Sequence, residues 1–158
     1  MTRLTTILGY LGLIPFLLPL AVMVNGFVFG NGLQGVSVFG FYGPYVFISY
    51  SAVILSFLTG TLWSRARLTD DNTMARAGVV ASNLLALAVW ASLLLIYVAP
   101  LLTVFAVCLL LAGYLALLYL ERFLQAQADK NYWKMRIQLT AIVCAAHLIL
   151  VAMMVMEL

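Results

Sequence analysis

The chain has 158 residues, of which 66% are hydrophobic and 8% are charged, and its formal net charge is +3. This composition excludes an ordinary soluble domain, in which about a quarter of the residues are charged. The lysines and arginines flank apolar segments and form no patch with interleaved aromatic residues, so the charge argues against a nucleic-acid partner and for the lipid bilayer.

The apolar segments predict membrane-spanning helices, each of which needs about 20 residues to cross a bilayer. We expect them at about 4–24, 44–64, 75–98, 100–121 and 133–156. The predicted fold is therefore an all-α bundle of five transmembrane helices, and a single integral membrane domain covers residues 1–158.

Prolines divide the predicted helices at two places. Pro15 and Pro19 should kink the first helix, because proline has no N–H to donate. The short, uncharged connection at Pro100 predicts that the third and fourth helices form an antiparallel hairpin.

Residues 25–43 lie between the first two predicted helices and hold six of the eleven glycines, five aromatic residues and no charge. We predict a flexible, apolar loop. Two roles are open for it: a simple connection, or a segment in the outer interface, where aromatic rings are favoured.

Basic residues fall on one side of a five-span arrangement. They are Arg3, Arg65, Arg67, Arg76, Arg122, Lys130, Lys134 and Arg136. The positive-inside rule then predicts a cytoplasmic N-terminus and an outer C-terminus. The first apolar run is followed by no A-x-A-like cleavage site and preceded by no transit-type segment, so we expect a retained helix and a bacterial inner membrane.

Small residues recur every four positions in two of the predicted helices, a spacing typical of helices whose backbones approach closely. The residues predicted to pack in this way are Ala52, Ser56, Gly60, Ser64, Gly78 and Ser82.

His147 is the one histidine in the sequence and lies near the middle of the last predicted helix. Ionisable residues in a membrane are costly, so a proton-relay or ligand-contacting role is one hypothesis. A neutral imidazole that links helices through a hydrogen bond is the other. Arg136, Thr140 and Cys144 share its helix face, which we expect to point into the bundle.

Other polar residues suggest a pocket in the inner half of the bundle. Asn83 is predicted at a depth similar to Ser56, Thr59 and Cys144. We therefore take His147, Asn83, Tyr50, Ser56, Cys144 and Thr140 as candidate ligand contacts. A structural amide link between helices is an equal alternative for Asn83.

The sequence contains no recognisable catalytic or metal-binding motif. There is no H-E-x-x-H, no G-x-S-x-G and no phosphate-binding glycine loop, and Cys108 and Cys144 have neither paired nor metal-type spacing. We expect no metal site and no enzymatic activity, and the sequence identifies no cofactor.

Three motifs occur in order at the first, second and fifth predicted helices. They are Gly12-Leu-Ile-Pro15-Phe16, the run from Tyr50 through Ser56-Phe57 and Gly60 to Trp63, and Trp133-x-x-Arg136-x-x-Leu139-Thr140. Together they resemble the family called domain of unknown function 3429, which includes transmembrane protein 69-like small membrane proteins. The resemblance covers nearly the whole chain and implies a small multi-helix membrane protein without an assigned activity. The family usually has glycine after the tryptophan of the second helix, where this chain has another small residue, Ser64.

Two functions of different kinds follow from these patterns. The first is non-enzymatic binding or assembly with another membrane protein or a second copy, favoured by a tightly filled bundle with an exposed groove. The second is a sensor or carrier of a small hydrophobic ligand, favoured by a pocket within the bundle lined by Asn83, Tyr50 or His147. A membrane enzyme ranks last.

Overall fold

A computed structural model describes residues 3–30, 32–68, 73–124 and 130–158. Within these residues, five helical segments are long and apolar enough to cross a membrane. They are the pair α1 (Arg3–Leu11) and α2 (Ile14–Phe29), followed by α3 (Gly43–Leu68), α4 (Thr73–Leu95), α5 (Pro100–Leu124) and α6 (Lys130–Met156). The predicted all-α, five-span bundle is confirmed.

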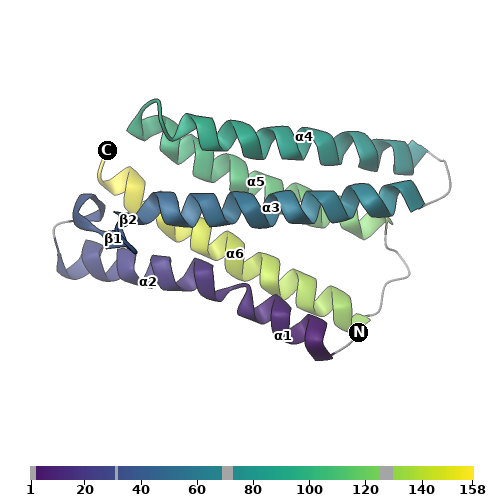
Figure 1. The fold of residues 1–158 in the computed structure, drawn as a ribbon, viewed down its shortest axis with the longest axis horizontal. Coiled ribbons are helices and arrows are strands. Elements are labelled where there is room, and N and C mark those ends of the chain that lie inside the picture. The colour runs from purple at the N-terminus through teal and green to yellow at the C-terminus, as the bar shows by residue number, and fades with distance from the viewer. Residues whose placement is uncertain (1–2, 31, 69–72, 125–129) are drawn as a thin grey trace.

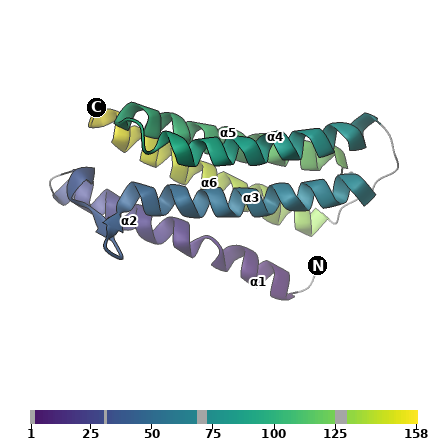
Figure 2. The same ribbon diagram turned by 45° about the horizontal axis from the view of Figure 1, so that its top comes forward.

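The segments run side by side as an elongated bundle (Figures 1 and 2). Helix α3 packs against α2, α4 and α5, and α6 packs against α2 and α5. Helix α4 contacts α3 and α5 and forms an edge of the bundle. The predicted hairpin is α4 and α5, with Pro100 as the first residue of α5.

Glycines allow two close approaches inside the bundle. A Cβ atom added at Gly113 of α5 would lie 2.6 Å from Leu55 Cδ2 of α3. One added at Gly78 of α4 would lie 3.0 Å from the Cβ of Ala66 of α3 and 2.8 Å from Leu124 Cδ1 of α5. Helices α3, α4 and α5 therefore contact one another with little free space at these points.

The first span is broken where a kink was predicted. Pro15 has no N–H, and the amide of Phe16 donates to the carbonyl of Leu13 (3.0 Å) instead of reaching back four residues. The carbonyl of Gly12 accepts a hydrogen bond from the Tyr50 hydroxyl of α3 (3.0 Å). A side chain of another helix thus bonds to the backbone at the break, as is required where helices are interrupted in a membrane.

The segment predicted as a flexible loop has regular structure. Its first residues extend α2 to Phe29, so the predicted end of this helix at residue 24 was too early. A short 3-10 helix, η1 (Leu33–Gly35), follows, and the carboxylate of Glu157 accepts a hydrogen bond from the amide of Leu33. The end of the chain is thereby tied to this segment.

A two-stranded antiparallel hairpin, β1 (Ser37–Val38) and β2 (Phe41–Tyr42), leads into α3. Its turn residues both have positive φ, 54° at Phe39 and 81° at Gly40, as in a type I′ turn. Glycine adopts this conformation freely, whereas phenylalanine rarely does. The Phe39 ring is 82% exposed, so no burial of the ring in the bundle offsets the strain.

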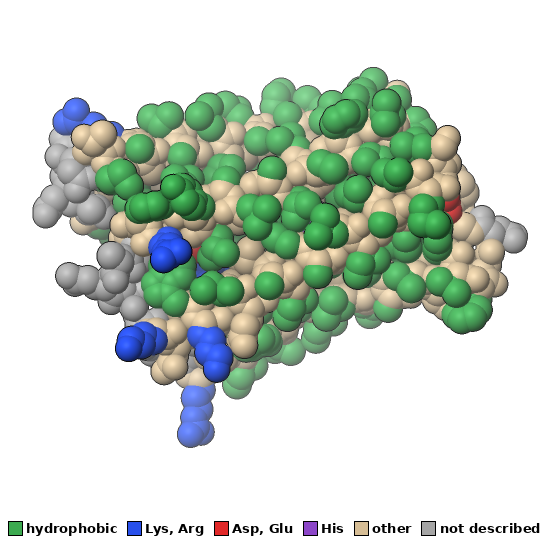
Figure 3. Space-filling model, turned by 180° about the vertical axis from the view of Figure 1, so that it is seen from behind, with side chains coloured by type: hydrophobic (Ala, Val, Ile, Leu, Met, Phe, Trp, Pro, Cys, Tyr) green, Lys and Arg blue, Asp and Glu red, His purple; other side chains and the backbone are tan. Residues whose placement is uncertain are grey.

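Charged and apolar side chains are segregated on the surface. Figure 3 shows lysine and arginine at one end of the bundle and hydrophobic side chains along its length. The ends that meet there are the starts of α1, α4 and α6 and the ends of α3 and α5. The cytoplasmic placement of this end stays a prediction.

Candidate functional site

His147 lies in α6 and is completely buried. Its Nδ1 is 2.7 Å from the carbonyl oxygen of Val143, and its Nε2 is 2.8 Å from Ser51 Oγ of α3. A carbonyl can only accept, so Nδ1 donates to Val143, and in the neutral ring Nε2 then accepts from the Ser51 hydroxyl. Both ring nitrogens are thereby hydrogen-bonded.

Aromatic rings surround this histidine. The ring centroids of Phe47, Tyr114 and Phe16 lie 4.9, 5.5 and 6.1 Å from that of His147. Such a setting favours the interpretation of His147 as a link between α3 and α6 rather than as a proton relay.

Sequence reasoning missed Ser51, whose hydroxyl bonds His147 and whose backbone carbonyl accepts from Tyr114 Oη (2.9 Å). Ser56, the serine of this helix that we predicted as a ligand contact, is exposed. Helix α3 carries hydroxyl side chains on buried and exposed faces alike, so composition gave no sign of which serine faces inward. The depth of Ser51 along its helix was the one signal that could have found it.

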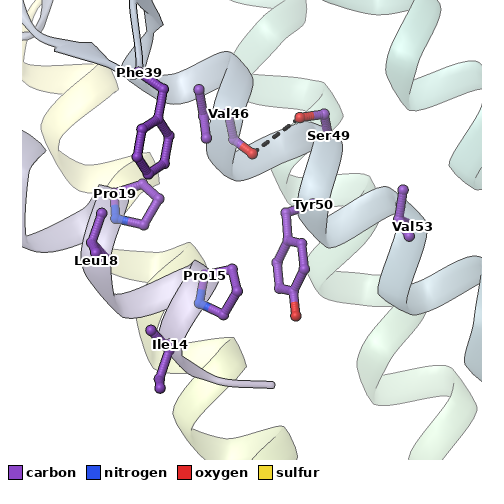
Figure 4. Close-up of a pocket in the computed structure, with 9 residues that line it drawn as sticks. All are labelled: Ile14, Pro15, Leu18, Pro19, Phe39, Val46, Ser49, Tyr50 and Val53. Atoms are coloured by element: carbon purple, nitrogen blue, oxygen red, sulfur yellow. Dashed lines mark hydrogen bonds between the residues drawn. The ribbon is translucent and has the colours of Figure 1, made fainter. Parts of the chain in front are cut away.

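Beside the broken span lies a cavity of about 440 Å³ between α2 and α3. Figure 4 shows Pro15 and Pro19 of α2 and Phe39 of the hairpin on one side, and Tyr50 and Val53 of α3 on the other. The lining is almost wholly apolar.

A second cavity, of about 160 Å³, lies on the other side of the break. Apolar residues of α1, α3 and α6 form most of its wall, and its polar residues are Tyr114, Arg136 and Thr140. The Tyr50 ring lines the first cavity, while Gly12, to which its hydroxyl bonds, lines the second. We call the two cavities together the crevice, and the Tyr50 side chain lies between its two parts.

Arg136 forms a buried ion pair with Glu121 of α5. Arg136 Nε donates to Glu121 Oε2 (2.9 Å), and Arg136 Nη2 lies 2.7 Å from the same oxygen. The two residues are 7% and 1% exposed. Nε makes the hydrogen bond, whereas the buried Nη2 meets the same oxygen as an ion-pair contact and has no acceptor in hydrogen-bond geometry among the described residues.

A second arginine approaches the same carboxylate. Arg65 Nη1 of α3 lies 3.9 Å from Glu121 Oε1 and donates to Tyr132 Oη (3.1 Å). Two guanidinium groups thus share one carboxylate. Glu121 stands next to Arg122 in the sequence and has the appearance of a solvated charge, but it is buried because the last turn of α5 faces the first turns of α6 and encloses its side chain.

The structure places the predicted ligand contacts in different surroundings. Tyr50 and Thr140 line the crevice. Asn83 is exposed on α4 and donates to the carbonyl of Val79 (2.8 Å). Cys144 is half-buried, and Ser56 is exposed. The shared inner pocket expected for Asn83, Ser56 and Cys144 is not formed.

The predicted packing residues divide in the same way. Ala52, Gly78 and Ser82 are buried, whereas Ser56, Gly60 and Ser64 are exposed. A Cβ atom added at Gly60 would meet nothing within 4 Å. This part of α3 therefore presents small side chains outward instead of packing within the described bundle.

Comparison with known proteins identifies a family for nearly the whole chain. The family model described as "Protein of unknown function (DUF3429)" matches residues 1–152. No curated protein and no solved structure matches the chain.

Proposed function

We propose that this chain, which belongs to the family of proteins of unknown function DUF3429, is a non-enzymatic multi-pass membrane protein that binds a lipid-like small molecule in the crevice. We further propose that it resides in a bacterial inner membrane with the basic end in the cytoplasm, as the charge pattern predicts.

One observation carries this proposal: Arg136 belongs to the crevice wall, and its buried Nη2, which lies 2.7 Å from Glu121 Oε2, has no acceptor in hydrogen-bond geometry among the described residues. A buried N–H group that lacks an acceptor in hydrogen-bond geometry lowers the stability of the fold, so each such group in a folded protein calls for an explanation. A bound polar or acidic group in the 160 Å³ cavity would supply the acceptor.

The apolar cavity suits the remainder of such a molecule. Its 440 Å³ lies within the range of about 300–1,000 Å³ typical of small-molecule sites. The Tyr50 side chain lies between this cavity and Arg136, and a single side-chain hydrogen bond to the carbonyl of Gly12 holds it there. Such a bond contributes only about 1 kcal/mol to stability. Rotation of Tyr50 would join the two cavities and let one molecule extend from Pro19 to Arg136.

A catalytic role has less support. The Ser51–His147 pair resembles part of a catalytic dyad, but Nδ1 of the histidine donates to a backbone carbonyl instead of to an orienting carboxylate. Both residues are fully buried. These features support a structural role for the pair.

Native mass spectrometry of the detergent-purified protein tests the proposal. We expect a copurifying small molecule on the wild type and its loss from Val53→Trp, which fills the apolar cavity. Val80→Trp is the matched control, because Val80 and Val53 are similarly exposed, 59% and 63%, and Val80 lies on α4 away from the crevice. Equal occupancy in both variants would contradict binding in the crevice.

A second candidate is association with another membrane helix through the outward face of Ser56, Gly60 and Ser64. The open space around Gly60 favours it, since small exposed residues let a partner helix approach closely. Gly60→Leu should then lower the fraction of oligomer or complex seen by native mass spectrometry while the stability of the monomer is kept. An unchanged stoichiometry would contradict this candidate.

A further inference from the structure

A groove of about 690 Å³ lies between α5 and α6 on the outer surface of the bundle. We call it the α5–α6 groove, and its lining residues are Leu115, Leu118, Tyr119, Arg122, Trp133 and Ile137. None of these residues lines the crevice, so the two sites are separate.

The lining changes in character along the groove. Leu115 and Arg122 are seven residues apart on one face of α5, or about 10 Å along the helix. Leu115 and Ile137 lie toward the middle of the bundle, whereas Arg122 and Trp133 lie at the basic end. The groove is therefore apolar at one end and carries a cation and an indole at the other.

Positive charge dominates the basic end of this groove. Arg122 is exposed and makes no ion pair with a carboxylate of the described residues. Glu121, the carboxylate next to it in sequence, is buried and paired with Arg136. Lys134 adds another exposed cation, on the first turns of α6.

We propose that the α5–α6 groove binds one anionic phospholipid from the bilayer. Arg122 pairs with the phosphate, and the Trp133 indole lies at headgroup level, where such rings are favoured. An acyl chain lies along Leu115, Leu118 and Ile137. The order of cation, indole and apolar side chains matches the order of groups in a phospholipid, which supports this occupant over a protein segment.

Lipid competition at Trp133 tests this site. The probe is a chain with Trp63→Phe and Trp90→Phe, in phosphatidylcholine bilayers that contain brominated phosphatidylglycerol or brominated phosphatidylcholine. Bromine quenches tryptophan fluorescence at contact, so the quenching reports the lipid beside Trp133. We expect a preference of about fivefold for phosphatidylglycerol, the factor that corresponds to about 1 kcal/mol for one basic residue at a membrane surface.

Arginine variants separate a specific site from general surface attraction. Arg122→Gln should abolish the preference, and Arg122→Lys should keep most of it. Arg67→Gln is the control, because it removes the same charge from the same end of the bundle. In the native chain the Arg67 guanidinium stacks over the Trp63 ring of α3, 4.8 Å from the ring centroid. The Arg67→Gln substitution should therefore leave the lipid preference intact. No preference at Trp133, or an equal loss in Arg67→Gln and Arg122→Gln, would overturn the proposal.

Discussion

Two consecutive residues of α3 link it to other helices in contrasting surroundings. Ser51 is completely buried, and its hydroxyl bonds a histidine enclosed by three aromatic rings. Tyr50 is half-buried, and its hydroxyl bonds the backbone at a helix break with cavities on both sides. Similar hydrogen bonds thus have different settings: the first joins two helices in a filled interior, and the second lies between two cavities that we propose as a ligand site.

The largest effect on stability is expected at the ion pair between Glu121 and Arg136, of which Arg136 lines the crevice. Glu121→Ala leaves Arg136 as an uncompensated buried charge, which should destabilise the fold by about 3–5 kcal/mol. Unfolding in mixed detergent micelles measures this. The double variant Glu121→Leu/Arg136→Met should recover most of the loss, and a single variant as stable as the wild type would mean that the pair is solvated.

Glycine substitutions compare filled space with open space. Gly78→Leu should lower stability by about 1–3 kcal/mol, because its side chain meets Ala66 and Leu124. Gly60→Leu should change monomer stability by less than about 0.5 kcal/mol, as other surface changes do. Thermal unfolding of the two variants in one detergent gives the comparison, and similar losses would show that α3 packs differently around Gly60.

The two hydrogen bonds of α3 can be removed separately. Ser51→Ala leaves Nε2 of His147 unsatisfied in a sealed site and should cost about 1–3 kcal/mol without changing ligand binding. Tyr50→Phe should cost about 0.6 kcal/mol, the average for polar contacts in membrane bundles, and should speed ligand exchange. Chemical unfolding measures the stability of the two variants, and ligand dissociation rates measure exchange. Faster exchange in the Ser51 variant alone would contradict the roles given to the two hydrogen bonds.

Phe39 offers a small effect of the opposite sign, a gain in stability. Phe39→Asn should stabilise the hairpin slightly, by about 1 kcal/mol at most, because asparagine tolerates positive φ better. Its ring is lost from the mouth of the crevice, so ligand retention should fall. Thermal unfolding with and without ligand checks this, and unchanged retention would show that the ring does not cover the bound molecule.

The number and order of helices could be predicted from the sequence, because membrane-spanning segments differ so strongly in hydropathy from their connections. Pro15 also marked the break correctly, since the missing N–H is a local property. On α3 and α4, the direction in which a side chain faces could not be predicted. Both lipid and protein interior are apolar, so the pattern along α3 and α4 did not show that Ser51 faces inward and Asn83 outward.

Partners distant in sequence explain the other failures. Glu121 next to Arg122 has the appearance of a solvated pair, and only the position of Arg136 on α6 reveals the buried ion pair. The segment 25–43 was expected to be a loop because of its glycines. Its hairpin depends on a turn that places phenylalanine, an unusual residue there, at positive φ.

Photolabelling tests ligand binding in the crevice most directly. A long-chain fatty acid that carries a diazirine on its chain supplies the acidic group and the apolar body, and peptide mass spectrometry locates the label. We predict label on the parts of α2 and α3 that line the apolar cavity, around Pro15, Pro19 and Val53, and its loss with excess unlabelled fatty acid. Label spread over exposed side chains such as Leu84 and Leu87 of α4, and unaffected by competitor, would contradict the account.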